Sequence, residues 1–298
     1  MSRVAGVLAL ALTMLGCSGF INRQAATSTY RILEKSMVAA RRQADVELAR
    51  DAMPGGLIQL EAFSLAYPDH TGFRTLHTES VCQYVVAFVF DDWEDAKLGG
   101  RDADTDRLAT RLGPLLERCT ELNLDRLPPA WRAAWAKGAD AVAALLPTAK
   151  REHVAALLWI ATASSVRLAT NPLRHFRELG AIQAMLARCS ELWPGFHDAD
   201  AELLLATLVA ARSSVFGGDD GSVQFARARQ LAGEGALMVD VMAARGTLVA
   251  RKDRPALEAT LTALIATDVT RWPERRLSNE LALRKARRYL AAAAVLVP

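Results

Sequence analysis

Apolar residues recur with a helical period along almost the whole chain. Segments such as RLATRLGPLLERCTELN, REHVAALLWIATASSVRLA and LGAIQAMLARCSELWP place apolar side chains at positions i, i+3, i+4 and i+7. Clusters of Gly, Pro or Asp separate these segments, and the alternating β-branched runs typical of strands are nearly absent. Ala, the strongest helix former, and Leu dominate the composition. The pattern predicts an all-α protein whose helices begin near Asp45, with a break at Pro54 and a stop at Pro68.

Two short sequences echo each other inside this helical pattern. LLERCTEL ends at Leu122 and MLARCSEL ends at Leu192, 70 residues later. Helices also end at a bulky residue plus proline at Trp193-Pro194 and again at Trp272-Pro273. Both spacings equal about two units of 35 to 40 residues, the period of tetratricopeptide (TPR) helical hairpins, which bury their apolar faces against their neighbours. The strict TPR signature is missing, so we predict stacked helical hairpins with degenerate TPR-like repeats.

The first residues, MSRVAGVLALALTMLGCSG, have the composition of a secretory signal. Arg3 gives a positive start, and the apolar stretch 4–15 is too short to cross a bilayer as a helix. Gly16 followed by Cys17 resembles a bacterial lipobox, in which Cys17 is lipidated and becomes the mature N-terminus. Ordinary cleavage that leaves Cys17 as an incidental thiol is the alternative. Ser18 after the cysteine resembles the outer-membrane sorting pattern, which would place the protein body in the periplasm.

These features divide the chain of 298 residues into three parts. We assign 1–17 to a lipoprotein signal peptide, 18–43 to a tether and leading segment that turns helical before Ala44, and 44–298 to a TPR-like α-helical domain. The net charge of +3 is too close to neutral to suggest a nucleic-acid partner. The paired arginines Arg41-Arg42, Arg275-Arg276 and Arg287-Arg288 lack interleaved aromatic residues, so we predict that they lie on solvated helix faces.

Cysteine usage favours no particular pairing. Besides Cys17, the chain has Cys82, Cys119 and Cys189, an odd number for an oxidising compartment, and no C-x-x-C pair. Each of the three lies within an apolar helical pattern, so we predict small buried core thiols. A disulfide among them is the alternative.

The stretch VFGGDDGSVQFARARQLA contains the strongest loop signal in the chain. A phosphate loop would need a G-x-x-x-x-G-K-[ST] pattern after a strand, and a calcium loop would need alternating acidic oxygens closed by a glutamate. Neither pattern is present. We predict instead an elbow in which Gly217 or Gly218 ends one helix in a left-handed conformation and Asp219 or Asp220 caps the next.

No residue pattern in the chain indicates catalysis. The five histidines include no i, i+4 pair and no H-E-x-x-H motif, and G-x-S-x-G is absent. We expect His153 to start a helix and the residue after His197 to cap one. The acidic run Asp91–Asp95 favours a helix start or a solvated face over a cation site. We expect no enzyme activity, no metal and no cofactor.

The tryptophans allow two interpretations. Trp131 and Trp135 are four residues apart and share one helix face, and Trp159 lies in the apolar segment LLWIATASSV. Core packing is the simpler interpretation. The alternative is that these rings line an apolar groove or channel between stacked hairpins.

Several blocks in order resemble the T-component lipoproteins associated with TRAP (tripartite ATP-independent periplasmic) transporters. They are ELARDAMPGGLIQLEAF, AFVFDDWEDA, LLWIATASSVRLA, VFGGDD and WPERRLSNELALRKARRYL, and they extend from about Asp45 to the C-terminus. One departure is that the family usually has Pro after Asp219, where this chain has Asp220 and a glycine. The resemblance implies TPR-type hairpins, similarity to a trimer with an apolar channel, and a partner in the transporter's solute-binding P component. It implies no catalytic site.

We therefore expect a membrane-anchored periplasmic accessory protein that binds this partner and an apolar organic acid. The alternative is a periplasmic helical-repeat scaffold that organises envelope proteins and binds no small molecule. An enzyme on a helical scaffold is the least favoured hypothesis. Candidate functional residues are Cys17 for lipidation and, from the family-like blocks, Trp159, Phe216 and Asn279 for a groove or interface. Each of these three also has a structural alternative: core packing for Trp159, an elbow plug for Phe216, and for Asn279 a bond to a carbonyl of a neighbouring helix.

Overall fold

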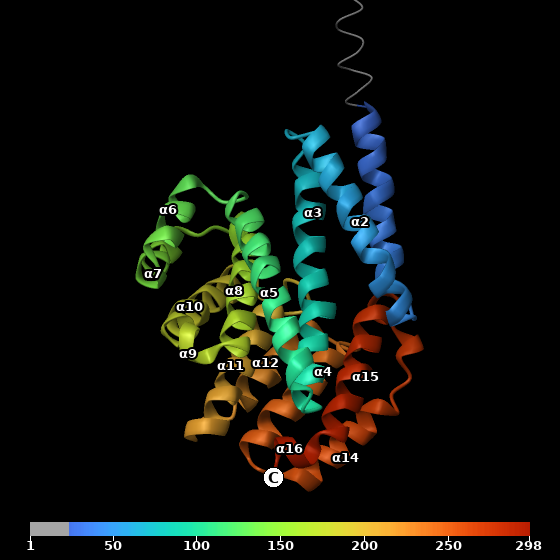
Figure 1. Ribbon diagram of the computed structural model, residues 1–298, viewed down its shortest axis with the longest axis vertical. Helices are drawn as coiled ribbons and strands as arrows, with labels where there is room; N and C mark the ends of the chain where they lie inside the picture. The colour runs from blue at the N-terminus through green and yellow to red at the C-terminus, as the bar shows by residue number, and fades with distance from the viewer. Residues whose placement is uncertain (1–23) are drawn as a thin grey trace, which may run out of the picture.

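The computed structural model describes residues 24–298, which contain helices and no strands, as the sequence predicts (Figure 1). The signal peptide and Cys17 lie outside the described residues. Residues 24–41 are helical. The α-helices that follow are α2 (Val46–Ala66), α3 (Thr71–Tyr84), α4 (Asp91–Leu98), α5 (Asp102–Leu124), α6 (Pro129–Lys137), α7 (Ala139–Leu145), α8 (Val154–Thr170), α9 (Pro172–His175), α10 (Leu179–Leu192), α11 (Asp200–Phe216), α12 (Ser222–Ala232), α13 (Leu237–Ala243), α14 (Arg254–Ile265), α15 (Arg276–Ala291) and α16 (Ala293–Leu296).

Two details differ from the sequence expectation. The predicted break at Pro54 is wrong: α2 continues through it to Ala66 and ends, as predicted, just before Pro68. A proline removes one helical hydrogen bond, and packing of α2 along α3 outweighs that loss. The second difference lies in AWRAAWAKGADAVAALL, where the apolar spacing predicts one helix and Gly138, with a φ of 103°, separates α6 from α7.

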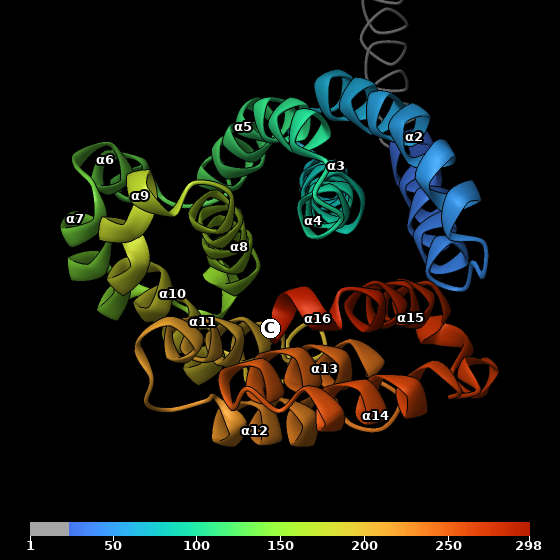
Figure 2. The same cartoon turned by 60° about the horizontal axis from the view of Figure 1, so that its bottom comes forward.

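The helices pack mainly on their neighbours in sequence and follow a curved path. α2 packs on α3, α5 on α4 and α8, α10 on α8 and α11, and α13 and α14 pack on α15. Figure 2 shows this path bending round until α15 returns beside α2, a pairing that contacts between the two helices also show. Within residues 24–298, the core is correspondingly divided into four apolar clusters rather than one centre.

The central helix α8 is the most apolar of the long helices that the structure describes. With the preceding short turn it forms a helix, Arg151–Thr170, long and apolar enough to cross a membrane, but 72% of its most apolar window is buried inside the protein. His153 ends that 3₁₀ turn (Arg151–His153) and immediately precedes α8, close to the predicted helix start. Burial on nearly every side explains the composition, because a helix that is apolar all round belongs in a protein core or a membrane.

The VFGGDDGSVQF stretch is an elbow, as predicted. Gly217, at φ 74°, ends α11, and Gly221, at φ 77°, precedes α12. Asp219 Oδ1 accepts a hydrogen bond from the Gly221 N–H at 2.9 Å, and Asp220 Oδ1 accepts one from the Ser222 N–H at 3.0 Å. Asp220 therefore bonds to a free N–H in the first turn of α12, although the residue directly before that helix is Gly221.

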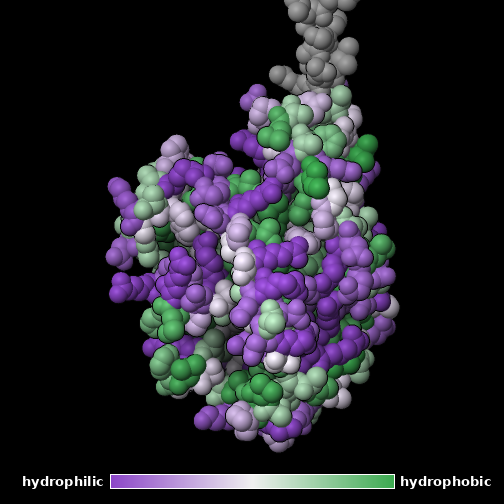
Figure 3. All heavy atoms as spheres, in the orientation of Figure 1, coloured by the Kyte–Doolittle hydropathy of each residue, from purple (hydrophilic) through white to green (hydrophobic). Residues whose placement is uncertain are grey.

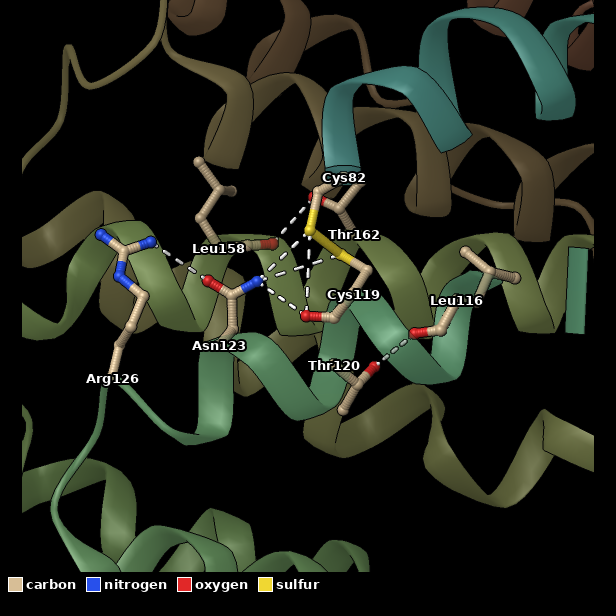
Figure 4. The surroundings of a disulfide bond; sticks show 8 residues. All are labelled: Cys82, Leu116, Cys119, Thr120, Asn123, Arg126, Leu158 and Thr162. Carbon is tan, nitrogen blue, oxygen red and sulfur yellow. Dashed lines mark hydrogen bonds between the residues drawn. A yellow bond between two sulfur atoms is a disulfide. The ribbon is translucent and has the colours of Figure 1, made fainter. Parts of the chain in front are cut away.

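A disulfide corrects the prediction of three free core thiols. Cys82 in α3 and Cys119 in α5 are bonded, with Cα atoms 5.2 Å apart (Figure 4). Asn123, one turn after Cys119, donates from Nδ2 to the Cys119 carbonyl at 2.8 Å. Packing of α3 on α5 brings the two cysteines together, and spacing along the chain carried no sign of that contact. Cys189 remains a buried free thiol, and burial raises its pKa to about 12.

A buried cluster of ion pairs joins α4 to α15, and it includes two residues that we predicted on solvated helix faces. Asp91 is 2% exposed and Arg288 is 8% exposed, so neither lies on a solvated face. Asp91 contacts Lys285 Nζ at 2.9 Å. Glu94 accepts one hydrogen bond from Lys285 at 2.6 Å and another from the Tyr289 hydroxyl at 2.8 Å. Burial by itself would raise the pKa of Asp91, but Lys285 and Arg288 outweigh it and lower this pKa to about 2. The acidic run does start α4, as predicted.

Candidate functional site

A cavity of about 320 Å³ lies among α6, α7, α8, α10 and the short connection between α8 and α10. Trp135 of α6 and Val142 of α7 form one wall, and Ile182 and Met185 of α10 form another. Its volume is at the lower end of the range found for small-molecule sites, and its lining is mainly apolar with a few polar groups, as such sites usually are.

Local sequence explains how these walls form. Trp131 and Trp135 share one face of α6 because they are four residues apart. Trp131 is buried in the core, where it is 3% exposed, and Trp135, one turn later, lines the cavity. Gly138 turns the chain sharply between α6 and α7 and lines the cavity itself. On the far side, Pro172 starts the one-turn helix α9, and the Asn171 side chain accepts from the Arg174 N–H to cap it.

Arg167 supplies the positive charge of this cavity. Its side chain is partly buried, its Nη2 donates to Ser164 Oγ at 3.1 Å, and its guanidinium lies 5.6 Å from the centre of the Trp135 ring. Among residues 24–298, no carboxylate pairs with it within 4.0 Å. Burial lowers the pKa of Arg167, and the negative charges of Glu178 and Glu117 oppose that shift. An arginine stays protonated at neutral pH, so the cavity holds a cation in mainly apolar surroundings.

His175 and Glu178 complete the polar part of the lining. His175 Nδ1 lies 2.8 Å from Glu178 Oε1, and both residues belong to the α8–α10 connection. Glu178 is therefore held by His175 and is not bonded to Arg167. The arrangement combines a cation, a carboxylate held by a histidine and apolar walls, which suits the binding of a small molecule.

The structure places Trp159 outside this cavity. It is buried in the apolar cluster between α3, α5 and α8, with 7% of its surface exposed. Its ring meets the His197 ring edge to face at 6.2 Å, and its Nε1 has no hydrogen-bond partner among the described residues.

Burial lowers the pKa of His197. His197 and the two residues after it have positive φ and lead into α11, so the predicted cap beside His197 is instead a left-handed turn with no side-chain cap bond.

Phe216 and Asn279 lie in two further places. Phe216, at the end of α11, is 72% exposed. Asn279 of α15 is 1% exposed, and its Oδ1 accepts from the Leu237 N–H at 3.3 Å. That bond ties α15 to the start of α13. Asn279 therefore contacts a neighbouring helix, but it bonds to a backbone N–H of that helix rather than to the carbonyl that we expected. The structure thus does not bring Trp159, Phe216 and Asn279 together.

A second cavity of about 210 Å³ between α4 and α5 is polar. Charges of both signs line it, and its arginines already have partners: Arg101 donates to Asp95 at 2.5 Å, and Arg107 to Asp104 at 3.0 Å. Within residues 24–298, no group of three or more His, Cys, Asp or Glu side chains is placed to hold a metal ion. The Arg167 cavity is therefore the stronger candidate for a small-molecule site.

Comparison with known protein families agrees with the order of the sequence blocks. A family model described as the TRAP transporter T-component matches residues 42–296, nearly all of the described chain. The chain belongs to the TRAP transporter T-component family. Members of this family are transport-associated accessory proteins rather than enzymes, and association with TRAP transporter components follows from membership. No protein with a curated description matches the chain.

Our sequence reasoning missed Arg167 as a candidate site in this T-component, although the residue lies in the family-like block LLWIATASSVRLA. One signal was available. Arg167 is the only charged residue of α8, the most apolar of the long helices that the structure describes. A charged side chain in a mostly buried helix needs a partner or a function, and the sequence shows no acidic residue at i±3 or i±4.

Proposed function

We propose that this T-component is a lipid-anchored accessory protein on the periplasmic side of a bacterial membrane, the outer membrane rather than the inner. It binds the periplasmic solute-binding protein of a TRAP transporter and an apolar organic acid. The observation that carries the proposal is the family match over residues 42–296. The Arg167 cavity supports the ligand part, because it combines a cation with apolar walls.

The anchor and the architecture belong to the same proposal. Cys17 becomes the mature N-terminus and carries the acyl chains, residues 18–43 lead into the folded body, and 44–298 form degenerate TPR-like hairpins. Packing of successive helices on each other along a curved path supports a repeat architecture. The assembly is a homotrimer, as in the T-component resemblance.

Exposed apolar side chains support a partner surface around Phe216. Large apolar residues that are more than half exposed lie at the ends of α9 and α11 and the start of α12: Leu173, Phe176, Val215, Phe216 and Val223. Figure 3 shows hydrophobic residues over the α9 and α11 ends, at the lower left of the molecule. Such a concentration on a surface is typical of a protein interaction site.

The test is association of the full-length, detergent-solubilised chain with a purified TRAP solute-binding protein, measured by sedimentation. We expect a trimer that binds, and at least tenfold weaker binding for Phe216→Asp. Val295→Asp in α16 is the control, because Val295 is 67% exposed and lies far along the chain from Phe216. A strict monomer without affinity for the solute-binding protein overturns the proposal. Recovery of envelope-assembly proteins without any transporter component favours the scaffold alternative.

A further inference from the structure

We infer that the Arg167 cavity binds a monocarboxylate with an apolar tail, its acid group on Arg167 and its tail between α6 and α10. The inference rests on the proposed function only for the source of the ligand. The site itself follows from the charge, shape and lining of the cavity.

The charge of Arg167 defines the head group. A guanidinium presents parallel N–H donors that match the two oxygens of a carboxylate, and such bidentate pairs are among the strongest hydrogen bonds in proteins. Arg167 is partly buried and has no bonded carboxylate. It therefore lacks the partner that a charge removed from water requires. The hydrogen bond to Ser164 and the Trp135 ring hold the guanidinium in place without neutralising it.

The walls define the tail. Trp135, Val142, Ile182 and Met185 give an apolar lining with no group that could pair with a second charge. The one carboxylate in the lining, Glu178, is held by His175 and would repel a second negative charge. A dicarboxylate of the same length is therefore disfavoured, and so is an alcohol, which carries no charge for Arg167.

The size of the cavity limits the length of the tail. A volume of about 320 Å³ suits a small ligand. Transfer of each methylene group out of water favours binding about fourfold, so affinity should rise with chain length and stop rising when the cavity is full.

The experiment titrates the full-length chain with octanoate and follows binding by calorimetry and by tryptophan fluorescence, because Trp135 lines the cavity. We expect saturable binding of octanoate, about fourfold weaker binding of heptanoate, and at least tenfold weaker binding of octanedioate and of 1-octanol. Arg167→Gln should weaken octanoate binding at least tenfold. Arg177→Gln, at an exposed neighbouring arginine, should leave it unchanged.

A second variant tests the cavity without touching the charge. Ala181 lines the cavity, so Ala181→Phe should fill it and abolish octanoate binding while the helical circular dichroism stays unchanged. Equal octanoate affinity in the wild type and Arg167→Gln overturns the inference, as does 1-octanol binding as tight as octanoate, or no octanoate binding at all. These titrations contain no solute-binding protein, so their failure leaves the proposed association intact. Conversely, Arg167→Gln should still bind that partner.

Discussion

Arg288 and Asp91 form a buried two-bond ion pair between helices that are 197 residues apart in sequence. Arg288 Nη2 donates to Asp91 Oδ2 at 2.6 Å and Nη1 donates to Asp91 Oδ1 at 3.0 Å. The pair joins α15 to α4, while Arg284 of α15 reaches Glu47 of α2 at 2.6 Å. The curved path of helices is thus held at its ends by charge as well as by apolar contact.

Breaking this pair should cost much more stability than breaking an exposed one. Arg288→Met leaves Asp91 and Glu94 short of a buried partner, and such changes cost about 3–5 kcal/mol. Arg254→Met is the control, because its bond to Glu258 at 2.7 Å is largely exposed and such pairs contribute about 0.5 kcal/mol or less. The free energy of unfolding in urea is the measurement. Equal losses of unfolding free energy in the two variants would show that the buried pair contributes no more to stability than the exposed pair.

The disulfide should stabilise the folded state because it closes a long loop of the chain. Cys82 and Cys119 are 37 residues apart, and closing a loop of that length stabilises a folded protein by about 3–4 kcal/mol. The double variant Cys82→Ala/Cys119→Ala should lose that amount in urea unfolding. Cys189→Ala is the matched control: it removes a buried thiol that closes no loop. A double variant no less stable than this control would contradict the pairing.

Asp200 should make stability fall as the pH rises towards neutrality. Burial, with a smaller contribution from Asp198, raises the pKa of Asp200 to about 7. A carboxyl group whose pKa is higher in the folded state than in the unfolded state favours folding only while it is protonated. Its ionisation therefore lowers stability progressively from about pH 4 to pH 7, by up to about 4 kcal/mol.

The measurement is urea unfolding at pH 5 and pH 8.5. Asp200→Asn should gain stability over the wild type at pH 8.5 and little at pH 5. Asp102→Asn is the control, since Asp102 is also the first residue of its helix, α5, but is exposed. If Asp200→Asn has the same effect at both pH values, ionisation of Asp200 does not cause the loss of stability at higher pH.

Gly235 should tolerate no side chain. Its φ is +82°, and an added Cβ would lie 2.5 Å from the Trp272 ring. Gly235→Ala should therefore cost about 2–4 kcal/mol from strain and displacement of the ring. Gly233→Ala isolates the backbone part, because Gly233 has a similar φ of +76° and open space around it, and should cost about 1–2 kcal/mol. Thermal unfolding of the two variants compares these costs, and equal shifts would rule out a steric role for Trp272.

The candidate ligand site could be predicted only in part. The apolar segment around Trp159 and the helix pair Trp131/Trp135 pointed to α6 and α8, two of the cavity walls. The choice of Trp159 as the lining residue is not what the cavity shows, because that ring lies in the apolar cluster that α8 shares with α3 and α5. Phe216 is exposed, as an interface residue would be, and its role stays a prediction.

The sequence by itself determined the features that depend on neighbours within a few residues. Helical periodicity, the glycines and aspartates of the elbow after Phe216, and the helix end before Pro68 all follow from backbone conformation and from hydrogen bonds that span at most a few positions. The order of the blocks also indicated the family, because that pattern is read along the chain.

Only the tertiary structure decided which distant residues meet. The Cys82–Cys119 bond, the burial of Arg288 against Asp91 and the placement of Arg167 beside Trp135 each require particular helices to pack in a particular register. Amphipathic helices specify an apolar face but not the partner that covers it. Packing in three dimensions therefore makes that choice, and with it decides whether a polar residue is solvated, paired or left facing a cavity.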